Sequence, residues 1–198
     1  MRERRRPSEV RQVELADAAL RLIASKGIAA LSTRALADEV GLTTGAIFRH
    51  FSSIEAVLEA VVERVESVLD ATFPAETLPP LERLEAFVEA RSSAVASQLG
   101  ILRLVLSEQF QLALSAKGSR RLGECVEKTR AFVARCVRDA QREGSIRDDI
   151  TPAEAARIVM GTIQMVAFDV GSGGARRATA AAAVLRLLKV PSPRGGRS

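Results

Sequence analysis

Side chains that could bind a polyanion lie together in a short run that begins at Thr44 and ends at His50. Thr44 and Arg49 can donate hydrogen bonds to bases or phosphates, and His50 can donate to phosphate. Gly45 and Ala46 are small enough for the backbone to approach bases and thymine methyl groups. A helix that faced only water would usually carry Glu and Lys, and this run has neither. The run therefore favours nucleic-acid recognition, and a solvated corner of a helical bundle is the alternative.

The surrounding residues predict two short helices joined by a sharp turn, with the polar run on the second helix. Ser32 and Thr43 can cap the two helices, because each side chain can accept a hydrogen bond from a first-turn amide. Gly41 can end the first helix, because glycine adopts the left-handed conformation without a Cβ penalty. Apolar residues four apart would point inward from the two helices, namely Leu36 and Val40, then Ile47 and Phe51. The pattern is typical of a helix-turn-helix, whose second helix lies in the DNA major groove, although other bundles contain similar corners.

Residues 10–62 resemble the TetR family of bacterial transcription regulators, and the rest of the chain is similar to it in length and helical pattern. The residues that carry the resemblance are Ala16, Leu20, Ile23, Gly27, Ser32, Thr33, Leu36, Ala37, Val40, Gly41, Leu42, Thr43, Gly45, Ala46, Ile47, Phe48, Arg49, His50, Phe51 and Glu55. The predicted DNA-binding residues are Thr33, Thr43, Thr44, Gly45, Ala46, Phe48, Arg49 and His50. The resemblance implies a palindromic operator in double-stranded DNA as the partner.

Two residues depart from the family pattern. Phe48 stands where the family usually has a tyrosine whose hydroxyl contacts phosphate, and Ile54 stands where it usually has a lysine. We therefore expect DNA affinity to depend more on backbone amides and on an arginine-rich arm at the amino terminus. That arm contains Arg2, Arg4, Arg5 and Arg6. A functionless, solubilising arm is the alternative.

Apolar periodicity predicts an all-α chain. With the resemblance, it predicts an N-terminal three-helix helix-turn-helix DNA-binding domain and a C-terminal helical domain for ligand binding and dimerisation. The predicted segments are a basic arm over residues 1–7, the helix-turn-helix domain over 8–52, a connecting helix over 53–73, the effector-binding and dimerisation domain over 74–190, and a tail over 191–198. Individual helices are expected over residues 8–26, 81–97, 101–106, 108–116, 119–143, 151–170 and 176–189.

Two capping-box patterns indicate where helices begin. Ser52 and Glu55 would open the connecting helix, and Thr151 and Glu154 would open the helix over residues 151–170. In each pair the hydroxyl and the carboxylate can satisfy first-turn amides reciprocally.

Composition limits the class of protein. Of the 198 residues, 47% are hydrophobic and 27% are charged, which is typical of globular proteins. A net charge of +5 and a pI near 10.0 favour a polyanionic partner. No apolar run approaches the ~18 residues of a membrane span, and no apolar signal core follows the first arginines. We therefore expect a cytoplasmic protein with no membrane partner.

No residue pattern predicts catalysis, a metal or a cofactor. The single histidine, His50, has no Ser/His/Asp arrangement around it, and no glycine loop follows a predicted strand. Cys125 and Cys136 lie on one predicted helix, roughly 16 Å apart along its axis, which is too far for a disulfide. We interpret them as small core residues, and a redox-sensing thiol is the alternative. We expect no enzymatic activity, no metal site and no cofactor.

The last two predicted helices, over residues 152–170 and 176–189, carry more apolar side chains than a terminal pair needs. These include Ile158, Val159, Ile163, Val166, Val184, Leu185, Leu187 and Leu188. The resemblance implies that two such pairs form a four-helix bundle in a homodimer. Packing of these residues inside one chain is the alternative.

The resemblance also implies an effector pocket in the C-terminal domain. Its candidate lining residues are Phe87, Leu102, Leu106, Phe110, Met160, Gln164 and Phe168. Such a lining is apolar with few charges, so it suggests a small hydrophobic effector, although each residue could be an ordinary core residue.

These patterns and the resemblance together predict a sequence-specific, homodimeric transcription repressor. A small hydrophobic effector would release it from DNA by tilting the helix that begins at Ser52. Two alternatives are a DNA-binding protein of the same fold controlled by a protein partner, and a helical interaction protein or small enzyme without DNA binding.

Overall fold

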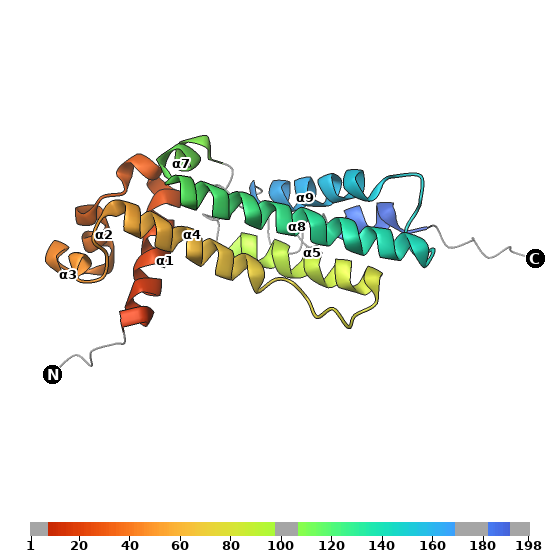
Figure 1. Cartoon of the computed structure of the whole chain (residues 1–198), viewed down its shortest axis with the longest axis horizontal. Helices are drawn as coiled ribbons and strands as arrows, with labels where there is room; N and C mark the ends of the chain where they lie inside the picture. The colour runs from red at the N-terminus through yellow and green to blue at the C-terminus, as the bar shows by residue number, and fades with distance from the viewer. Residues whose placement is uncertain (1–7, 98–106, 169–181, 191–198) are drawn as a thin grey trace, which may run out of the picture. The chain divides into compact units, whose positions relative to one another are not determined.

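The computed structural model describes residues 8–97, 107–168 and 182–190, and the regular structure within them is helical (Figure 1). The all-α fold class is confirmed. The chain forms two compact units. The amino-terminal unit comprises Met1–Ala71 with Ser97–Cys125, and the carboxy-terminal unit comprises Thr72–Ala96 with Val126–Ser198. The functional segments predicted from the sequence remain predictions.

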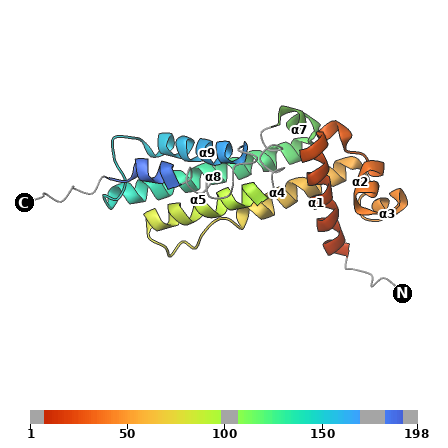
Figure 2. The same cartoon turned by 180° about the vertical axis from the view of Figure 1, so that it is seen from behind.

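The amino-terminal unit is built around its first helix, which crosses two others. Its elements are α1 (Ser8–Lys26), the 3-10 helix η1 (Ile28–Ala30), α2 (Thr33–Val40), α3 (Thr44–Phe48), α4 (Ile54–Asp70), α7 (Glu108–Ala113) and the first part of α8 (Ala116–Arg142). Helix α1 packs against α2 and α4, as the reverse view shows (Figure 2). The helix predicted over residues 8–26 is confirmed.

The core of this unit lies between α1, α2, α3, α4, α7 and the beginning of α8. Its fully buried side chains include Leu15, Leu22, Leu36, Ile47, Val57 and Val61. Burial of these apolar surfaces is the main force that holds the helices together. At the edge of the core, Arg64 Nε lies 2.7 Å from Asp17 Oδ1, which joins α4 to α1 by an ion pair.

A row of ion pairs joins the beginning of α8 to α4. Lys117 Nζ lies 3.1 Å from Glu59 Oε2, and Arg121 pairs with Glu63 at 2.9 Å and with Glu66. The hydrogen bond from Lys117 is the main cause that lowers the pKa of Glu59. Water and salt screen exposed pairs of this kind, so they orient the helices more than they stabilise them.

The predicted cap of the connecting helix is wrong by one residue. Ser53, and not Ser52, is the N-cap of α4, because its Oγ accepts a hydrogen bond from Ala56 N at 3.2 Å. Its hydrogen bond with Glu55 is the main cause that lowers the pKa of that carboxyl. Either of two adjacent serines could cap the helix, and the second one is the N-cap because its backbone is extended.

The predicted break at residues 117–118 is also wrong. Helix α7 ends at Ala113, and Gly118 lies inside α8, which begins at Ala116. The Oγ of Ser115 accepts a hydrogen bond from Gly118 N at 3.1 Å, so this serine satisfies a first-turn amide of α8. Glycine is tolerated here because it falls in the first turn of the helix.

The carboxy-terminal unit contains α5 (Pro80–Ser97), the remainder of α8, α9 (Pro152–Phe168) and a helical stretch over residues 182–188. The predicted capping box of α9 is confirmed, since Thr151 N donates to Glu154 Oε2 at 2.9 Å and Glu154 N donates to Thr151 Oγ1 at 3.3 Å. Fully buried core residues of the unit include Leu84, Phe87, Val133, Val137 and Val159. The predicted helix over residues 101–106 and the first part of the one over 176–189 lie outside the described residues.

Candidate nucleic-acid interface

The turn between α2 and α3 is fixed by backbone geometry that only a few residue types adopt easily. Gly41 has φ 66° and ψ 34°, in the left-handed region, and ends α2. Leu42 N then donates to Ala37 O at 2.9 Å, which satisfies a carbonyl of the last turn. Thr43 is extended, and its Oγ1 accepts a hydrogen bond from Ala46 N at 3.3 Å. The predicted caps and turn are therefore confirmed.

Two apolar side chains anchor α3 to the unit and decide which face points outward. Ile47 is fully buried and Phe51 is nearly so. With these two inside, the opposite face carries exposed Thr43, Thr44, Gly45, Phe48 and Arg49. Ala46, His50 and, on α2, Thr33 are half-buried. The structure thus brings the predicted DNA-binding residues onto one helix-turn-helix, and their contacts with DNA remain a prediction.

A glutamine that was not predicted holds the end of the recognition helix. Gln12 Nε2 on α1 donates a hydrogen bond to the main-chain oxygen of His50 at 3.1 Å. His50 N donates in turn to Ile47 O at 2.9 Å, so the backbone continues to turn past the end of α3. No local pattern in the sequence signals this contact, because 38 positions separate the two residues.

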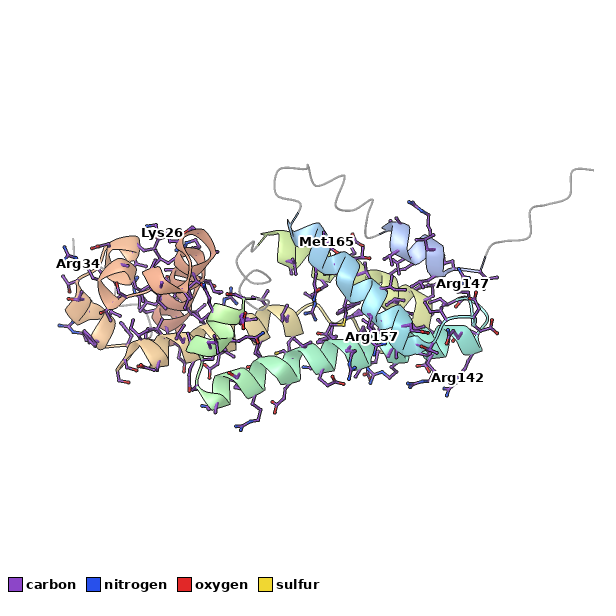
Figure 3. The ribbon with its side chains drawn as sticks, turned by 90° about the horizontal axis from the view of Figure 1, so that it is seen from above. Lys26, Arg34, Arg142, Arg147, Arg157 and Met165 are labelled. Carbon is purple, nitrogen blue, oxygen red and sulfur yellow. The ribbon has the colours of Figure 1, made fainter. Side chains whose placement is uncertain are left out.

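Two exposed cations of the amino-terminal unit were also missed. Arg34 is the second residue of α2, directly after Thr33, and Lys26 ends α1 (Figure 3). In a helix-turn-helix the first helix crosses the DNA backbone, so a cation at its beginning can bind phosphate. The sequence signal was available, because Arg34 follows a predicted N-cap and lies opposite the inward-facing Leu36.

The two departures from the family pattern differ in their surroundings. Phe48 is 54% exposed, as expected for a residue that faces DNA. Ile54 is half-buried and packs against the core of the amino-terminal unit. Replacing Ile54 by lysine would therefore remove a core contact as well as add a charge.

The proposed effector residues do not all lie in the same unit. Phe87 is fully buried in the carboxy-terminal unit, where Met160 and Gln164 on α9 are half-buried. Phe110 belongs to the core of the amino-terminal unit. Leu102, Leu106 and the side chain of Phe168 lie outside the described residues. Assignment of these residues to a pocket remains a prediction.

The apolar residues of the last two helices divide into buried and exposed sets. Buried within the protomer are Val159, Ile163, Val184, Leu185 and Leu188. Exposed are Ile158, Met165 and Leu187, and Figure 3 shows Met165 on α9. Part of the predicted set therefore packs inside the protomer, the side chain of Val166 lies outside the described residues, and the four-helix dimer interface remains a prediction.

The cysteines are core residues in this structure. Both Cys125 and Cys136 are buried, and burial raises the pKa of the Cys136 thiol to about 11. Because the thiolate is the reactive form, a thiol with this pKa is inert near neutral pH. The structure favours the core interpretation of Cys136 over the redox-sensing one.

The described residues contain neither a metal-binding cluster nor a membrane-spanning helix. No group of three or more His, Cys, Asp or Glu side chains is arranged to hold a metal ion there. In the same residues, no helix combines the length and the apolar character that a membrane crossing requires.

Comparison with known proteins gives a consistent result. Residues 15–61 match the family model described as bacterial regulatory proteins, tetR family. The HTH-type transcriptional regulator UidR of Escherichia coli K12 is 23% identical over 177 residues, which cover 89% of this chain and 90% of that protein. The HTH-type transcriptional repressor KstR2 of Rhodococcus jostii RHA1 is 27% identical over 164 residues, with 77% of this chain and 76% of that protein covered.

Solved structures show the same fold. The ketosteroid transcriptional regulator KstR2 of Mycobacterium tuberculosis superposes with a TM-score of 0.78 at 22% identity, over 91% of this chain and 96% of that one. AibR, in complex with isovaleryl coenzyme A and operator DNA, superposes with a TM-score of 0.77 at 18% identity, over 92% of this chain and all of that one.

Proposed function

We propose that this chain, which belongs to the TetR family of bacterial transcription regulators, is a homodimeric repressor that a small hydrophobic ligand releases from a palindromic operator. The proposal rests mainly on the outer face of α3, which points away from the core because Ile47 and Phe51 are buried on the opposite side. That face presents two hydrogen-bond donors, Thr44 and Arg49, beside two small residues. It carries no carboxylate, so it can approach the polyanion without repulsion.

The recognition helix would enter the major groove with its first turn foremost. There the backbone amides near Thr44 and the threonine hydroxyl can reach phosphates or base edges. The guanidinium of Arg49 can bind guanine through two parallel hydrogen bonds. Arg34 on α2 would bind the flanking phosphate backbone and set the orientation of the unit.

Repression and ligand release are inferred from relatives. KstR2 of Rhodococcus jostii is named as a repressor, and the solved KstR2 of Mycobacterium tuberculosis is named as a ketosteroid transcriptional regulator. AibR was solved in complex with isovaleryl coenzyme A and operator DNA. A hydrophobic ligand for this chain agrees with the apolar residues that the carboxy-terminal unit contributes to the predicted pocket, among them Phe87 and Met160.

The homodimer is supported by exposed apolar side chains on both of the last helices. Ile158 and Met165 on α9, and Leu187 on the following helix, face water in the isolated protomer. A two-fold dimer would bury such residues and would match the two-fold symmetry of a palindromic operator.

Ligand and DNA would act on each other through the chain itself. The backbone passes between the units at Ala71–Thr72, at Ala96–Ser97, and inside α8 at Cys125–Val126. A ligand that prefers the DNA-free conformation would shift the spacing of the two recognition helices in the dimer. Linkage then requires DNA to weaken ligand binding by the same factor.

The experiment is selection of bound duplexes from random DNA by the full-length protein, followed by titration of the selected operator at fixed salt. We expect a palindromic sequence that binds one dimer, with its half-sites about one helical turn apart. Binding that is equal for selected and scrambled duplexes would contradict the proposal. An operator that no small molecule releases would instead point to control by a protein partner.

A further inference from the structure

A cavity lies between α1 and α4 in the amino-terminal unit. Its volume is about 410 Å³, within the range of about 300–1,000 Å³ that is typical of small-molecule pockets. All of its lining residues fall within Met1–Ala71, so the cavity is formed inside one unit. None of them belongs to the predicted effector pocket. The cavity is therefore a different place in the molecule, between two helices that pack against each other (Figure 2).

The apolar part of the lining consists mainly of small side chains. Ala16 and Phe51 are buried there, and Ala56 and Ala60 on α4 are half-buried. Alanines leave space between the two helices that longer side chains would fill. Val13 on α1 also lines the cavity, and it is 46% exposed although it is a large apolar residue. An apolar body in the cavity would remove this surface from water, which is favourable.

The charged part of the lining is mostly acidic. Glu9 on α1 and both Glu59 and Glu63 on α4 line the cavity, together with a single cation, Arg64. The Nε of Arg64 lies 2.7 Å from Asp17 Oδ1, so the charge of this arginine is already compensated by another carboxylate. Arg64 therefore does not neutralise the three glutamates of the lining.

One of these glutamates has no countercharge in the structure. Glu59 pairs with Lys117 at 3.1 Å, and Glu63 pairs with Arg121 at 2.9 Å. Glu9 forms no ion pair or hydrogen bond with any of the residues that the structure describes. A carboxylate offers about four lone-pair sites, so Glu59 and Glu63 can still accept further hydrogen bonds. The cavity thus combines one uncompensated negative charge with additional acceptors and an apolar surface.

We propose that this cavity binds a small organic monocation, a protonated amine or amidine on a compact apolar body. The N–H groups of the cation donate to Glu9 and to a carboxylate of α4, and the apolar body covers Val13 and the alanines. Hydrogen bonds between charged groups are roughly twice as strong as those between neutral groups. A neutral molecule of the same shape leaves Glu9 without a countercharge, and an anion is repelled by the three glutamates.

The cavity also includes two residues that position the recognition helix. Gln12 lines it and donates a hydrogen bond to His50 O at 3.1 Å, and Phe51, also in the lining, anchors the chain after α3. A ligand in the cavity therefore contacts groups that form only when the amino-terminal unit is folded. Since the ligand binds the folded and not the unfolded chain, it should raise the midpoint of urea unfolding.

The test compares cations with neutral and anionic molecules of the same shape. Full-length, DNA-free protein is titrated by calorimetry with benzamidinium, cyclohexylammonium and 1-naphthylmethylammonium ions. The matched probes are benzamide, cyclohexanol, 1-naphthylmethanol and benzoate. We expect at least one cation to bind with a Kd about fivefold to tenfold below that of its neutral counterpart, and benzoate not to bind. The same cation, and not its counterpart, should raise the urea midpoint, and salt should weaken its binding.

Variants assign the binding to the cavity. Glu9→Gln should raise the Kd of the cation about twofold to fivefold without changing that of its neutral counterpart. Asp38→Asn is the matched control, because Asp38 is exposed on α2 and does not line the cavity, so the same charge is removed elsewhere in the unit. Ala60→Leu should fill part of the cavity and weaken every probe that binds. If circular dichroism shows that Ala60→Leu does not fold, Glu9→Gln and the probe comparison still decide the question.

Several results would overturn the inference. These are equal affinity for cations and neutral probes, unchanged cation binding in Glu9→Gln, an equal loss in Asp38→Asn, and a panel in which nothing binds. If cations bind only after residues 1–6 are deleted, the chain's own arginines occupy the cavity and an external ligand is excluded. None of these measurements uses DNA. Their failure therefore leaves the proposed function intact, and a failure to bind an operator leaves this inference intact.

Discussion

The side-chain amide of Gln12 donates a hydrogen bond to the main-chain oxygen of His50, with 3.1 Å between Nε2 and O. The bond joins α1 to the second residue after the end of the recognition helix. It therefore fixes how far the end of α3 stands from the body of the unit, and with it the position of Arg49.

Gln12→Leu should weaken both folding and DNA recognition. Loss of one partly buried hydrogen bond costs about 0.5–1.5 kcal/mol. We expect a lower midpoint in urea unfolding and a loss of affinity that is larger for the selected operator than for scrambled DNA. Glu9→Ala, an exposed change on the same helix, serves as the control. Equal operator binding by Gln12→Leu and the unsubstituted protein would show that the bond does not position α3.

Thr44→Ala and Arg49→Ala should lower specific affinity without destabilising the protein. Both side chains are exposed, so little packing is lost. A good base contact provides about 1–3 kcal/mol of discrimination. Competition titrations against single-base variants of the operator measure which base each residue reads. If neither substitution changes operator binding at fixed salt, this face of α3 does not contact DNA.

Arg34→Ala should weaken binding to all DNA sequences alike. A phosphate contact carries no base preference, and each one contributes about −0.9 to the slope of log affinity against log salt. The slope should become shallower by roughly one unit per protomer. The control is Arg21→Ala, since Arg21 is exposed on α1, where it pairs with Glu39 at 3.5 Å. A slope that is identical before and after the Arg34 change would remove this residue from the interface.

Phe48→Tyr should raise affinity across sequences, because Phe48 is exposed and a hydroxyl there can donate to phosphate. A hydroxyl carries no charge, so the salt slope should change little. Ile54→Lys should steepen the slope but lower the unfolding midpoint, since Ile54 packs against the core. Salt titration and urea unfolding of both variants measure these effects. If Phe48→Tyr by itself steepened the salt dependence, the expectation that only the charged lysine steepens it would be wrong.

Leu187→Asp should give a folded protomer that no longer dimerises. Leu187 is 70% exposed, so a carboxylate there is solvated in the monomer but would be buried in a dimer. Leu185→Asp should instead unfold the carboxy-terminal unit, because Leu185 is only 8% exposed within the protomer. Light scattering gives the mass and circular dichroism gives the helix content. A dimer that persists in Leu187→Asp places the interface elsewhere.

Cys136 should resist alkylation in the folded protein. Its pKa is raised from 9.0 to about 11 by burial, so folding favours the protonated thiol. The resulting contribution to stability is fully present below pH 9 and is lost as the pH rises through about 11. Mass spectrometry after iodoacetamide treatment at pH 8 should show slow modification, compared with the urea-unfolded chain. If Cys136 were modified as fast in the folded protein as in the unfolded chain, the result would favour the redox-sensing interpretation.

Local signals in the sequence determined the helix-turn-helix. Ser32, Gly41 and Thr43 act within three to five residues of themselves, through caps and a left-handed turn, so their effect can be read from neighbours alone. The inward spacing of Ile47 and Phe51 likewise depends only on the helical repeat. The same holds for Thr151 and Glu154, whose reciprocal hydrogen bonds span three positions.

Where several residues could form the same cap or core contact, only the tertiary structure decided which of them does. Two adjacent serines could cap α4, and the path of the chain selects Ser53. Leu185 and Leu187 look alike in sequence, yet the packing of the unit buries one and exposes the other. The Gln12–His50 bond depends on contacts between residues far apart in the chain. So do the ring contacts of Arg91 with Phe73, which is 18 positions away. Such contacts depend on how helices pack. The periodicity of one helix shows which of its own residues point inward, but not which residues of another helix they will meet.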